Sequence, residues 1–399
     1  MINQIIHGDC FDVLKNIPDS SIDLILTDPP YGLSFMGKNW DHGVPGVQFW
    51  IEALRVAKPG AHLFAFGGTR TFHRLAVAIE DAGWEIRDTI MWVYGSGFPK
   101  SLDVSKAIDK MAGAEREVVD SKEVSDMRGG NFKTSNGRIL VNITVPATEA
   151  AKQWQGWGTA LKPAFEPITV ARKPLTGTVA ENVLEHGTGA LNVDGCRVPL
   201  NGEVLTMTRP AANPNTDTKA PQTNRSDKPF EYRNDQGRWT ANLIHDGSEE
   251  VVGLFPETKS GKMKEGQIRT SKPLFGSKTD HIAETYGDSG SAARFFYCAK
   301  ASKSERSEGN THPTVKPLAL MKYLITLGLP PGGTVLDPFC GSGTTALACK
   351  ELGRNYICIE KELEYYQIAC NRLDQPIEPI PDEPIEEIID NSPLQLKLF

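Results

Sequence analysis

A short motif near the amino terminus combines groups suited to a planar molecule that carries an amino group. Asp28, Pro29, Pro30 and Tyr31 directly follow the apolar run of residues 22–27. The two prolines stiffen the backbone and leave the carbonyl of Pro29 without a partner in a strand. The Asp28 carboxylate and this carbonyl form a pair of acceptors for an exocyclic NH2 group. Tyr31 offers a face on which a planar base can stack.

A second motif, near the carboxyl terminus, has the features of a cofactor-binding loop. Asp337 ends an apolar run, and Gly341 and Gly343 precede a predicted helix. The glycines let the backbone approach a ligand, and Glu360 ends the next predicted strand, where it is placed to bind two ribose hydroxyls. The loop lacks the lysine of a P-loop, and Ala346 stands where a dinucleotide site prefers glycine. An acid before the glycines suits a cationic ligand, such as the ammonium and sulfonium of S-adenosylmethionine.

Both motifs lie where short apolar strands alternate with helices. The hydrophobic periods predict strands over residues 2–7, 22–27, 61–66, 84–92, 167–171, 294–299, 334–337 and 356–360. This alternation is typical of a mostly parallel α/β sheet covered on both faces. The polar stretches 110–150 and 200–290 lack either period. We therefore expect one sheet built from both ends of the chain and interrupted by an irregular insertion.

The two motifs, in this order, resemble those of the beta-class amino DNA methyltransferases, the DPPY-type family that modifies N6 of adenine or N4 of cytosine. The resemblance covers about the first 100 residues, a stretch near 160–174 and residues 292–373. It departs at Phe165, where the family usually has histidine before Glu166. The catalytic motif of the family falls on Asp28, Pro29, Pro30 and Tyr31. Its cofactor-binding positions fall on Asp9, Cys10, Asp28, Thr311, His312, Lys316, Asp337, Pro338, Phe339, Gly341, Ser342, Gly343, Thr344 and Glu360.

The resemblance implies a Rossmann-like methyltransferase sheet that is mostly parallel with one antiparallel strand. It places the catalytic half in residues 1–175, with an insertion near 110–155, and the target-recognition region in residues 176–291. The cofactor-binding half then occupies residues 292–374, and an acidic tail occupies residues 375–399.

The resemblance also implies an activity. The enzyme would move a methyl group from S-adenosylmethionine directly to the N6 amine of adenine in double-stranded DNA, after the base has flipped out of the duplex. Asp28 favours adenine, because serine more often stands at this position in cytosine enzymes. N4-cytosine methylation and a catalytically silent DNA-binding relative remain as alternatives. An RNA or protein-glutamine methyltransferase is a further rival, but those relatives usually carry asparagine at the position of Asp28.

Composition limits the other function classes. The 399 residues include 43 basic and 50 acidic side chains, and the net charge of −7 argues against a protein that coats nucleic acid nonspecifically. No apolar run reaches about 18 residues, so we expect no membrane span, and the first residues show no basic stretch followed by an apolar one, so we expect no secretory signal. The seven cysteines are scattered without a CxxC pair, which favours the reducing cytoplasm and predicts no metal site. The oligomeric state is left open between monomer and homodimer.

Two further segments suggest macromolecular partners. A cluster of basic residues is a candidate for contacts with DNA phosphates, with a solvated loop as the alternative; it comprises Lys259, Lys262, Lys264, Arg269 and Lys272. The chain ends in Gln395, Leu396, Lys397, Leu398 and Phe399, which resembles the peptide that binds the bacterial replication sliding clamp. Six acids and one lysine between residues 376 and 399 favour an extended, solvated tail. Packing of this apolar end on the enzyme's own sheet is the alternative.

Overall fold

The computed structural model describes most of the two ends of the chain and parts of its middle. The described residues are 2–33, 43–97, 101–125, 138–200, 205–209, 230–234, 237–259, 268–269, 281–282, 289–299 and 315–376. Among these residues, none of the helices has the length and apolar character needed to cross a membrane. All seven cysteines lie in the described part, and none of them forms a disulfide.

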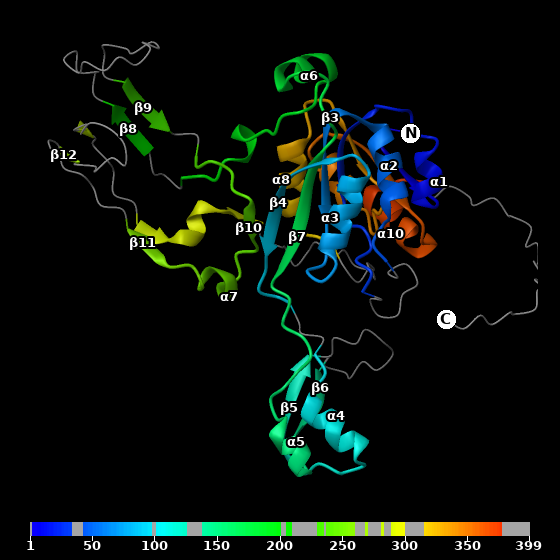
Figure 1. Ribbon diagram of the computed structural model, residues 1–399, viewed down its shortest axis with the longest axis vertical. Coiled ribbons are helices and arrows are strands. Elements are labelled where there is room, and N and C mark those ends of the chain that lie inside the picture. The colour runs from blue at the N-terminus through cyan, green and yellow to red at the C-terminus, as the bar shows by residue number, and fades with distance from the viewer. Residues whose placement is uncertain are drawn as a thin grey trace, which may run out of the picture.

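A nine-stranded sheet forms the centre of the molecule (Figure 1). Its strands, in spatial order, are β1 (Gln4–His7), β17 (Asn355–Glu360), β16 (Thr334–Asp337), β2 (Ile22–Thr27), β3 (Ala57–Phe66), β7 (Phe165–Arg172), β4 (Glu85–Val93), β10 (Leu243–His245) and β15 (Tyr297–Cys298). Strand β7 pairs antiparallel with both β3 and β4, and every other neighbouring pair is parallel. The expected mostly parallel sheet with one antiparallel strand is confirmed.

The two ends of the chain meet within this sheet. Strand β1 pairs with β17 over four positions, among them Ile5 with Cys358, and β2 pairs with β16 through Leu24 and Val335. Residues more than 300 positions apart in the sequence are therefore neighbours in space. The expectation of one sheet built from both ends of the chain is confirmed.

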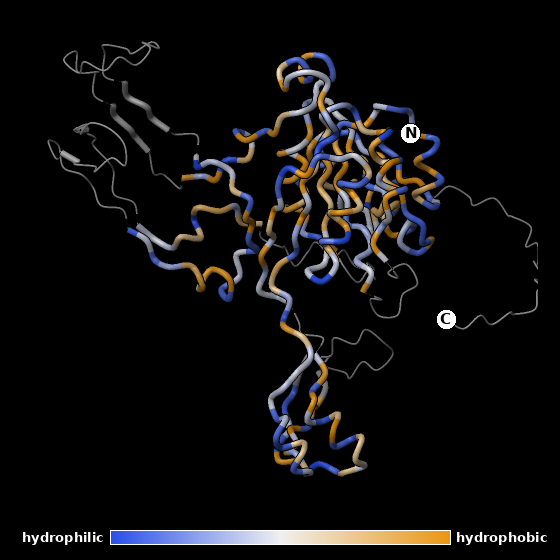
Figure 2. The backbone as a smooth tube through the Cα atoms, in the orientation of Figure 1, coloured by the Kyte–Doolittle hydropathy of each residue, from blue (hydrophilic) through white to orange (hydrophobic). Residues whose placement is uncertain are grey.

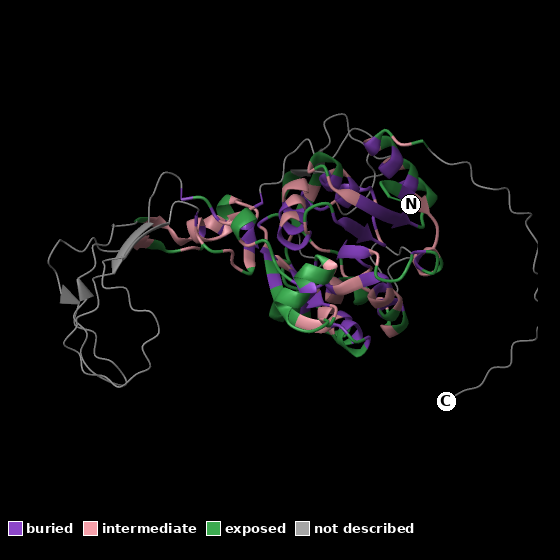
Figure 3. Cartoon of the chain, turned by 90° about the horizontal axis from the view of Figure 1, so that it is seen from above, coloured by how far each residue is buried: buried purple, intermediate pink, exposed green. Residues whose placement is uncertain are grey.

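Helices cover both faces of the sheet. Helices α1 (Cys10–Leu14), α2 (Val47–Val56) and α3 (Phe72–Asp81) share an apolar cluster with Ile25 and Leu63, whereas α8 (Leu318–Gly328), α9 (Thr344–Glu351) and α10 (Leu363–Leu373) share a second cluster with Leu24 and Phe64. Neighbouring residues of one strand thus enter different clusters, because side chains alternate across a sheet. This explains why β2 is apolar along most of its length and buried throughout. The hydrophobic and buried positions gather around this sheet (Figures 2 and 3).

Several boundaries differ from those predicted. Strand β3 begins at Ala57 rather than at the predicted residue 61, so it includes Lys58, Pro59 and Gly60. Gly60 takes a positive φ of 77° there and donates its N–H to the carbonyl of Lys173. The strand predicted at 294–299 is reduced to β15, because residues 292–295 form the 3-10 helix η4 (Ala292–Phe295).

The segment between β4 and β7 folds into a small unit of its own. It contains α4 (Val104–Met111), the hairpin of β5 (Val118–Ser125) and β6 (Arg138–Thr144), and α5 (Glu149–Gln153), and it projects from one end of the sheet (Figure 1). The buried Asp109 carboxylate accepts hydrogen bonds from Arg116 Nη1 at 2.7 Å and from the N–H and hydroxyl of Thr148 at 3.0 and 2.7 Å. Polar contacts thus organise a unit that the sequence pattern predicted as irregular.

The middle segment consists of short elements. These are α6 (Val179–His186), η3 (Asp194–Cys196), β8 (Leu205–Arg209), β9 (Phe230–Asn234), β10, α7 (Glu249–Val252), β11 (Glu257–Lys259), β12 (Ile268–Arg269), β13 (His281–Ile282) and β14 (Ser289–Ser291). Strand β10 joins the main sheet beside β4, where Ile244 pairs with Trp92. The segment is thereby anchored to the sheet, although its hairpins extend sideways from it (Figure 1).

Candidate active site

A cavity of about 1320 Å³ opens at one end of the sheet. Its walls include the residues that follow four parallel strands: Asp9 after β1, Asp28 after β2, Pro338 after β16 and Lys361 after β17. Carboxyl ends of parallel strands meet at one edge, and this edge is where open α/β sheets bind their ligands. The topology therefore brings the two sequence motifs, more than 300 residues apart, to one cavity.

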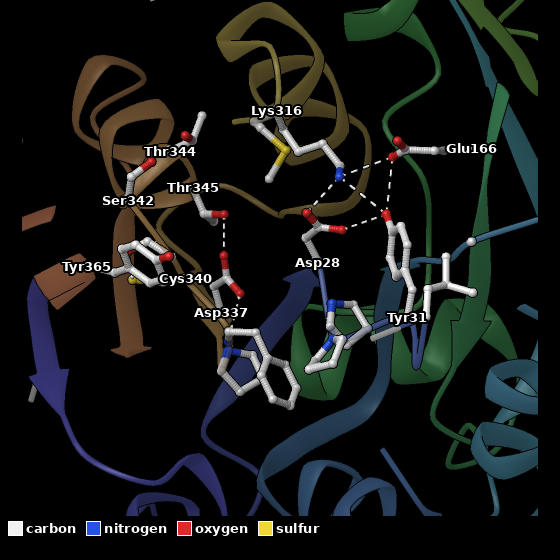
Figure 4. A pocket seen from close by; sticks show the side chains of 18 of the residues that line it. Asp28, Tyr31, Glu166, Lys316, Asp337, Cys340, Ser342, Thr344, Thr345 and Tyr365 are labelled. Atoms are coloured by element: carbon white, nitrogen blue, oxygen red, sulfur yellow. Dashed lines mark hydrogen bonds and ion pairs between the residues drawn. The ribbon is translucent and has the colours of Figure 1, made fainter. Parts of the chain in front are cut away.

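Asp28 lies at the centre of a hydrogen-bonded cluster in this cavity (Figure 4). The hydroxyl of Tyr31 donates to Asp28 Oδ1 at 2.7 Å, and the ammonium of Lys316 donates to Asp28 Oδ2 at 2.6 Å. Lys316 lies two residues before the first residue of α8. The carboxyl-terminal half of the chain therefore supplies the cation that contacts the amino-terminal motif. Resemblance placed Lys316 among the cofactor positions; in the structure it binds the catalytic motif.

Glu166 is a second carboxylate in the same cluster. Its Oε2 lies 3.1 Å from the Tyr31 hydroxyl and 3.1 Å from Lys316 Nζ, and its Oε1 lies 3.5 Å from the hydroxyl of Tyr94. Glu166 is the second residue of β7, and it reaches the cavity because β7 runs antiparallel. The amino end of this strand thus lies beside the carboxyl end of β3. The sequence placed Glu166 after Phe165 in the family resemblance but gave it no role in the site; its signal is an acid directly before the strand predicted at 167–171.

The negative charges of Asp28 and Glu166 and the positive charge of Lys316 stabilise one another. Burial opposes the ammonium of Lys316, but Asp28 and Glu166 raise its pKa above the usual lysine range, so it stays protonated. Burial, together with the same two carboxylates, raises the pKa of Tyr31 well above its usual range. Tyr31 therefore remains a neutral phenol that can donate its hydroxyl hydrogen.

The carboxylate of Asp337 links the glycine loop to the rest of the sheet. It accepts hydrogen bonds from the hydroxyl of Thr27 at 2.8 Å, from the hydroxyl of Thr345 and from the N–H of Phe339 at 3.1 Å. Burial raises the pKa of Asp337 to about 6, although the hydroxyls of Thr345 and Thr27 act in the opposite direction. Asp337 thus gains or loses its charge close to neutral pH.

Glu360 is fixed by backbone N–H groups. Gly341 donates to its Oε2 at 2.7 Å and Glu362 donates to its Oε1 at 2.8 Å. Burial raises the pKa of Glu360 to about 7, against the effect of these two hydrogen bonds. Each oxygen keeps a second lone pair, so the carboxylate is oriented and can still accept a hydroxyl from a ligand.

The two loop glycines have different surroundings. Gly341 has a φ of 53° and lines the cavity. Gly343 has a φ of 80° and turns toward α10, where an added Cβ would lie 2.9 Å from the Cβ of Ala369. Gly341 is therefore placed for a ligand, whereas Gly343 allows α9 and α10 to pack closely.

Asp9 caps helix α1 at the far side of the cavity. It accepts the N–H of Phe11 at 2.9 Å and the ammonium of Lys361 at 3.0 Å. Burial acts to raise the pKa of Asp9, but the hydrogen bond and charge of Lys361 and the backbone N–H groups of Phe11 and Asp12 together outweigh it, and the pKa lies below its usual value. Asp9 is thus an anion at neutral pH.

Most of the predicted site residues line this single cavity. They are Asp9, Cys10, Asp28, Pro29, Pro30, Tyr31, Lys316, Asp337, Pro338, Phe339, Gly341, Ser342, Thr344 and Glu360. The predictions at Thr311, His312, Lys262, Lys264, Lys272 and residues 395–399 lie outside the described residues, as does the side chain of Arg269. Lys259 is exposed at the end of β11.

Four further aromatic residues differ in their distance from the cavity. Tyr94 lines the cavity, whereas Trp92 is buried in the apolar core beside it. Trp154 and Trp157 form an exposed edge-to-face pair in the unit that contains α4 and α5, with ring centroids 5.0 Å apart. Thr345, Lys361 and Tyr365, which also line the cavity, were not predicted.

Comparisons with known proteins give one consistent family. A family model described as DNA methylase, N6_N4_Mtase, matches residues 22–371. The Type II methyltransferase M.HindIII of Haemophilus influenzae is 24% identical over 419 residues, which cover 94% of this chain and 96% of that protein. The Type II methyltransferase M.HinfI of Haemophilus influenzae is 41% identical over 87 residues, which cover 22% of this chain and 24% of that protein.

Solved structures of similar proteins include two methyltransferases. The M1.HpyAVI–SAM complex is 19% identical with a TM-score of 0.41, and the match covers 93% of this chain and 98% of that one. The PvuII DNA methyltransferase (cytosine-N4-specific) is 13% identical with a TM-score of 0.43, and the match covers 92% of this chain and 85% of that one.

Proposed function

The chain belongs to the N6/N4 DNA methylase family, whose family model matches residues 22–371, and we propose that it methylates the N6 amine of adenine in duplex DNA. The observation that carries the proposal is the meeting of two motifs in one cavity. Asp28, Pro29, Pro30 and Tyr31 form one wall, and the glycine loop that follows Asp337 forms another. One wall suits an amino-bearing base and the other suits a nucleoside cofactor.

The donor set of the second wall fits S-adenosylmethionine, which supplies an electrophilic methyl group on a sulfonium. The oriented carboxylate of Glu360 is suited to the ribose hydroxyls, and Asp337 offers negative charge to the ammonium and sulfonium. Gly341 lets the backbone approach the ligand, and Asp9 is suited to the amino group of its adenine ring. A cavity of about 1320 Å³ has room for both a cofactor and a flipped base.

The first wall would act on the target base. The amine is a poor nucleophile because its lone pair is delocalised into the ring. Hydrogen bonds to Asp28 and to the carbonyl of Pro29 would hold the amine so that this lone pair faces the methyl group. The negative charge of Asp28 would stabilise the positive charge that grows on the nitrogen. Stacking on Tyr31 would offset part of the cost of flipping the base, a few kcal/mol.

Adenine is preferred over cytosine because Asp28 stands at the first motif position. A cytosine enzyme of this type more often carries serine there. The distinction requires product analysis, because both bases present an exocyclic amine to the same pair of acceptors.

One experiment tests the activity and the base together. The full-length protein is incubated with S-adenosylmethionine and unmethylated plasmid DNA, and the DNA is digested to nucleosides for mass spectrometry. We expect N6-methyladenine that depends on the protein. Detection of N4-methylcytosine would support the DNA methyltransferase activity and refute the adenine assignment. No methylated base would refute the activity and favour a silent DNA-binding relative.

We further propose that the middle segment, residues 176–291, contacts DNA and selects the sequence. Its basic cluster, including the exposed Lys259 at the end of β11, supports this role through attraction to phosphates. A variant with Lys259, Lys262 and Lys264 all changed to glutamine should bind duplex DNA more weakly and show a smaller salt dependence of binding. Unchanged affinity and salt dependence would assign these lysines to a solvated loop.

We also propose that residues 395–399 bind the replication sliding clamp. The acidic composition of the tail, six acids and one lysine from residue 376, supports a segment that DNA repels. Such binding would raise the local concentration of the enzyme at new DNA without changing its chemistry. Deletion of residues 395–399 should abolish binding to purified clamp and leave methylation of short duplexes unchanged. Equal clamp binding by both proteins, or none by either, would contradict the proposal.

A further inference from the structure

Both oxygens of Asp28 are already engaged by donors of the protein. The Tyr31 hydroxyl donates to Oδ1 and Lys316 Nζ donates to Oδ2, at 2.7 and 2.6 Å. The proposed function, on which this inference rests, requires the amine of the target base to donate to the same carboxylate. Each oxygen has a second lone pair, but an amine that donates to Oδ1 shares the negative charge of this oxygen with the Tyr31 hydroxyl unless the hydroxyl turns away.

Glu166 supplies an alternative acceptor for the competing hydroxyl. Its Oε2 lies 3.1 Å from the Tyr31 hydroxyl oxygen, on the side away from Asp28 (Figure 4). A tyrosine hydroxyl carries one hydrogen, so its bonds to Asp28 and Glu166 are alternatives. Rotation about the bond between the ring and the oxygen moves this hydrogen from one carboxylate to the other. The ring itself, which faces the base, need not move.

Lys316 can stay where it is during this exchange. An ammonium has three hydrogens, and Lys316 Nζ lies within 2.6 Å of Asp28 Oδ2 and 3.1 Å of Glu166 Oε2. The pair of carboxylates thus keeps its shared cation while Asp28 Oδ1 becomes free for the amine.

Glu166 also determines the net charge next to the reacting nitrogen. Asp28 and Lys316 alone sum to zero, and Glu166 brings the cluster to −1. The amine gains positive charge as the methyl group is transferred, so a negative cluster stabilises the transition state more than the ground state. The side chains of Glu166 and Lys316 are only 19% and 9% exposed, so water screens these charges weakly.

We propose that Glu166 is a positioning residue of the methyl transfer: it accepts the Tyr31 hydroxyl when the target base takes Asp28 Oδ1, and it offsets the charge of Lys316. Glu166 acts through Tyr31 and Lys316 and needs no contact with the base. The role explains why an acid at the start of β7, the antiparallel strand of the nine-stranded sheet, points into the cavity.

Two substitutions separate the acceptor from the charge. Glu166→Gln keeps an acceptor oxygen and removes the charge, whereas Glu166→Leu removes both at similar volume. With unmethylated plasmid DNA and S-adenosylmethionine, we expect kcat to fall about tenfold for the glutamine variant and about 100-fold for the leucine variant. The dissociation constant of S-adenosylmethionine, measured by calorimetry, should change less than about twofold, because the glycine loop is untouched.

The Tyr31→Phe background provides the decisive comparison. Without the hydroxyl only the Lys316 ammonium still donates to this position, so the difference in kcat between the glutamine and leucine variants should become clearly smaller. A merely structural role would leave their ratio the same in both backgrounds, and that result would overturn the proposal. An undiminished kcat in Glu166→Gln would overturn it as well, even if the leucine variant does not fold.

A matched control lies at the other end of β7, where the last residue of the strand, the buried Arg172, pairs with Glu85 of β4 at 2.6 Å. Glu85→Gln removes this carboxylate. We expect its kcat to match the wild type, which separates the site effect from a general effect of losing an ion pair of β7. A wild-type protein that methylates no DNA would refute the proposed function itself. An active wild type with an equally active Glu166→Leu variant would refute only this inference.

Discussion

In the proposed reaction, the carboxylate of Asp28 is the main acceptor for the target amine at the residue scale. Its position is fixed by Tyr31 and Lys316, whose donor atoms lie at 2.7 and 2.6 Å. The cofactor wall, built around Asp337 and Glu360, has its own separate hydrogen bonds. Loss of Asp28 should therefore affect transfer and leave cofactor binding intact.

Asp28→Ala tests this separation. We expect methyl transfer to fall by at least about 1,000-fold, because the amine loses both its orientation and its charge stabilisation. The affinity for S-adenosylmethionine should stay within about threefold in calorimetry, since the glycine loop is unchanged. Transfer of labelled methyl groups within a few-fold of wild type would refute the role of Asp28.

The raised pKa values of Asp337 and Glu360 predict a pH-dependent cofactor affinity. Burial raises them to about 6 and about 7, so both acids become neutral as the pH falls through this range. A neutral acid attracts the cationic cofactor less, and we expect binding at pH 5.5 to be about tenfold weaker than at pH 8. In the Asp337→Asn variant, the loss of affinity for S-adenosylmethionine that occurs near pH 6 should disappear. An affinity that is constant between pH 5.5 and 8 would contradict the assignment.

The same two acids predict the pH dependence of stability. In the unfolded chain they lose their protons near pH 4, whereas in the folded protein they keep them up to about 6 and about 7. Their contribution to the free energy of unfolding therefore decreases as the pH rises through this window. The increase in melting temperature caused by S-adenosylmethionine should be larger at pH 8 than at pH 5.5. The opposite trend would show that the acids do not face the cofactor.

At the element scale, the turn between β16 and α9 determines how closely the cofactor loop packs. Gly343 and Gly353, at the two ends of α9, both have positive φ angles, of 80° and 63°. An added Cβ at Gly343 would lie 2.9 Å from Ala369 Cβ, whereas one at Gly353 meets no atom within 4 Å. The two positions share backbone strain and differ in packing.

Gly343→Ala and Gly353→Ala form a matched pair of variants. The strain of a left-handed alanine costs about 1–2 kcal/mol at either site. Overpacking against α10 should add about 1–3 kcal/mol at Gly343 alone. Urea unfolding should therefore show a larger loss of unfolding free energy for Gly343→Ala than for Gly353→Ala. The Gly343 variant should also bind the cofactor more weakly. Equal losses for the two variants would mean that α10 moves aside without cost.

The elements that a periodic pattern specifies were predictable from the sequence. Residues 22–27 and 334–337 form strands with the predicted bounds, because each is a continuous apolar run buried on both faces. The α4–α5 unit was not predictable, since its centre is the polar network around Asp109 and Arg116 rather than an apolar stripe. Strand β10 was missed for a different reason: three residues are too few to show a period.

The candidate site was predictable to the extent that its motifs are continuous in sequence. The tetrad that begins at Asp28 and the loop that follows Asp337 both line the cavity. The contact of Lys316 with Asp28 was not predictable, because it joins residues 288 positions apart through the order of the strands. The same reason applies to Glu166, whose place depends on the direction of β7.

At the scale of the whole molecule, the catalytic sheet carries separate additions that need not share its stability. The unit that contains α4, β5, β6 and α5 projects from the sheet and has a polar centre of its own (Figure 1). Four donors surround the buried Asp109 carboxylate, among them Arg116. Removal of this acceptor should loosen the unit and leave the sheet intact.

Asp109→Ala tests whether the unit unfolds independently. We expect a local destabilisation of about 3–5 kcal/mol, because Arg116 is left without its carboxylate partner. Limited proteolysis should then cut within residues 101–160 while the affinity for S-adenosylmethionine stays unchanged. The control is Glu149→Gln, which removes an exposed ion pair with Lys152 and should change little. Simultaneous loss of the unit and of cofactor binding would show that the two parts fold together.

We propose that this chain methylates adenine in DNA through Asp28. Methylome sequencing of a methylation-free bacterial host that expresses either the wild-type protein or Asp28→Ala tests this proposal. We expect N6-methyladenine at one recurring sequence in the wild-type host and none above background with the variant. Absence of any modified base in the wild-type host, or equal modification by the variant, would contradict it.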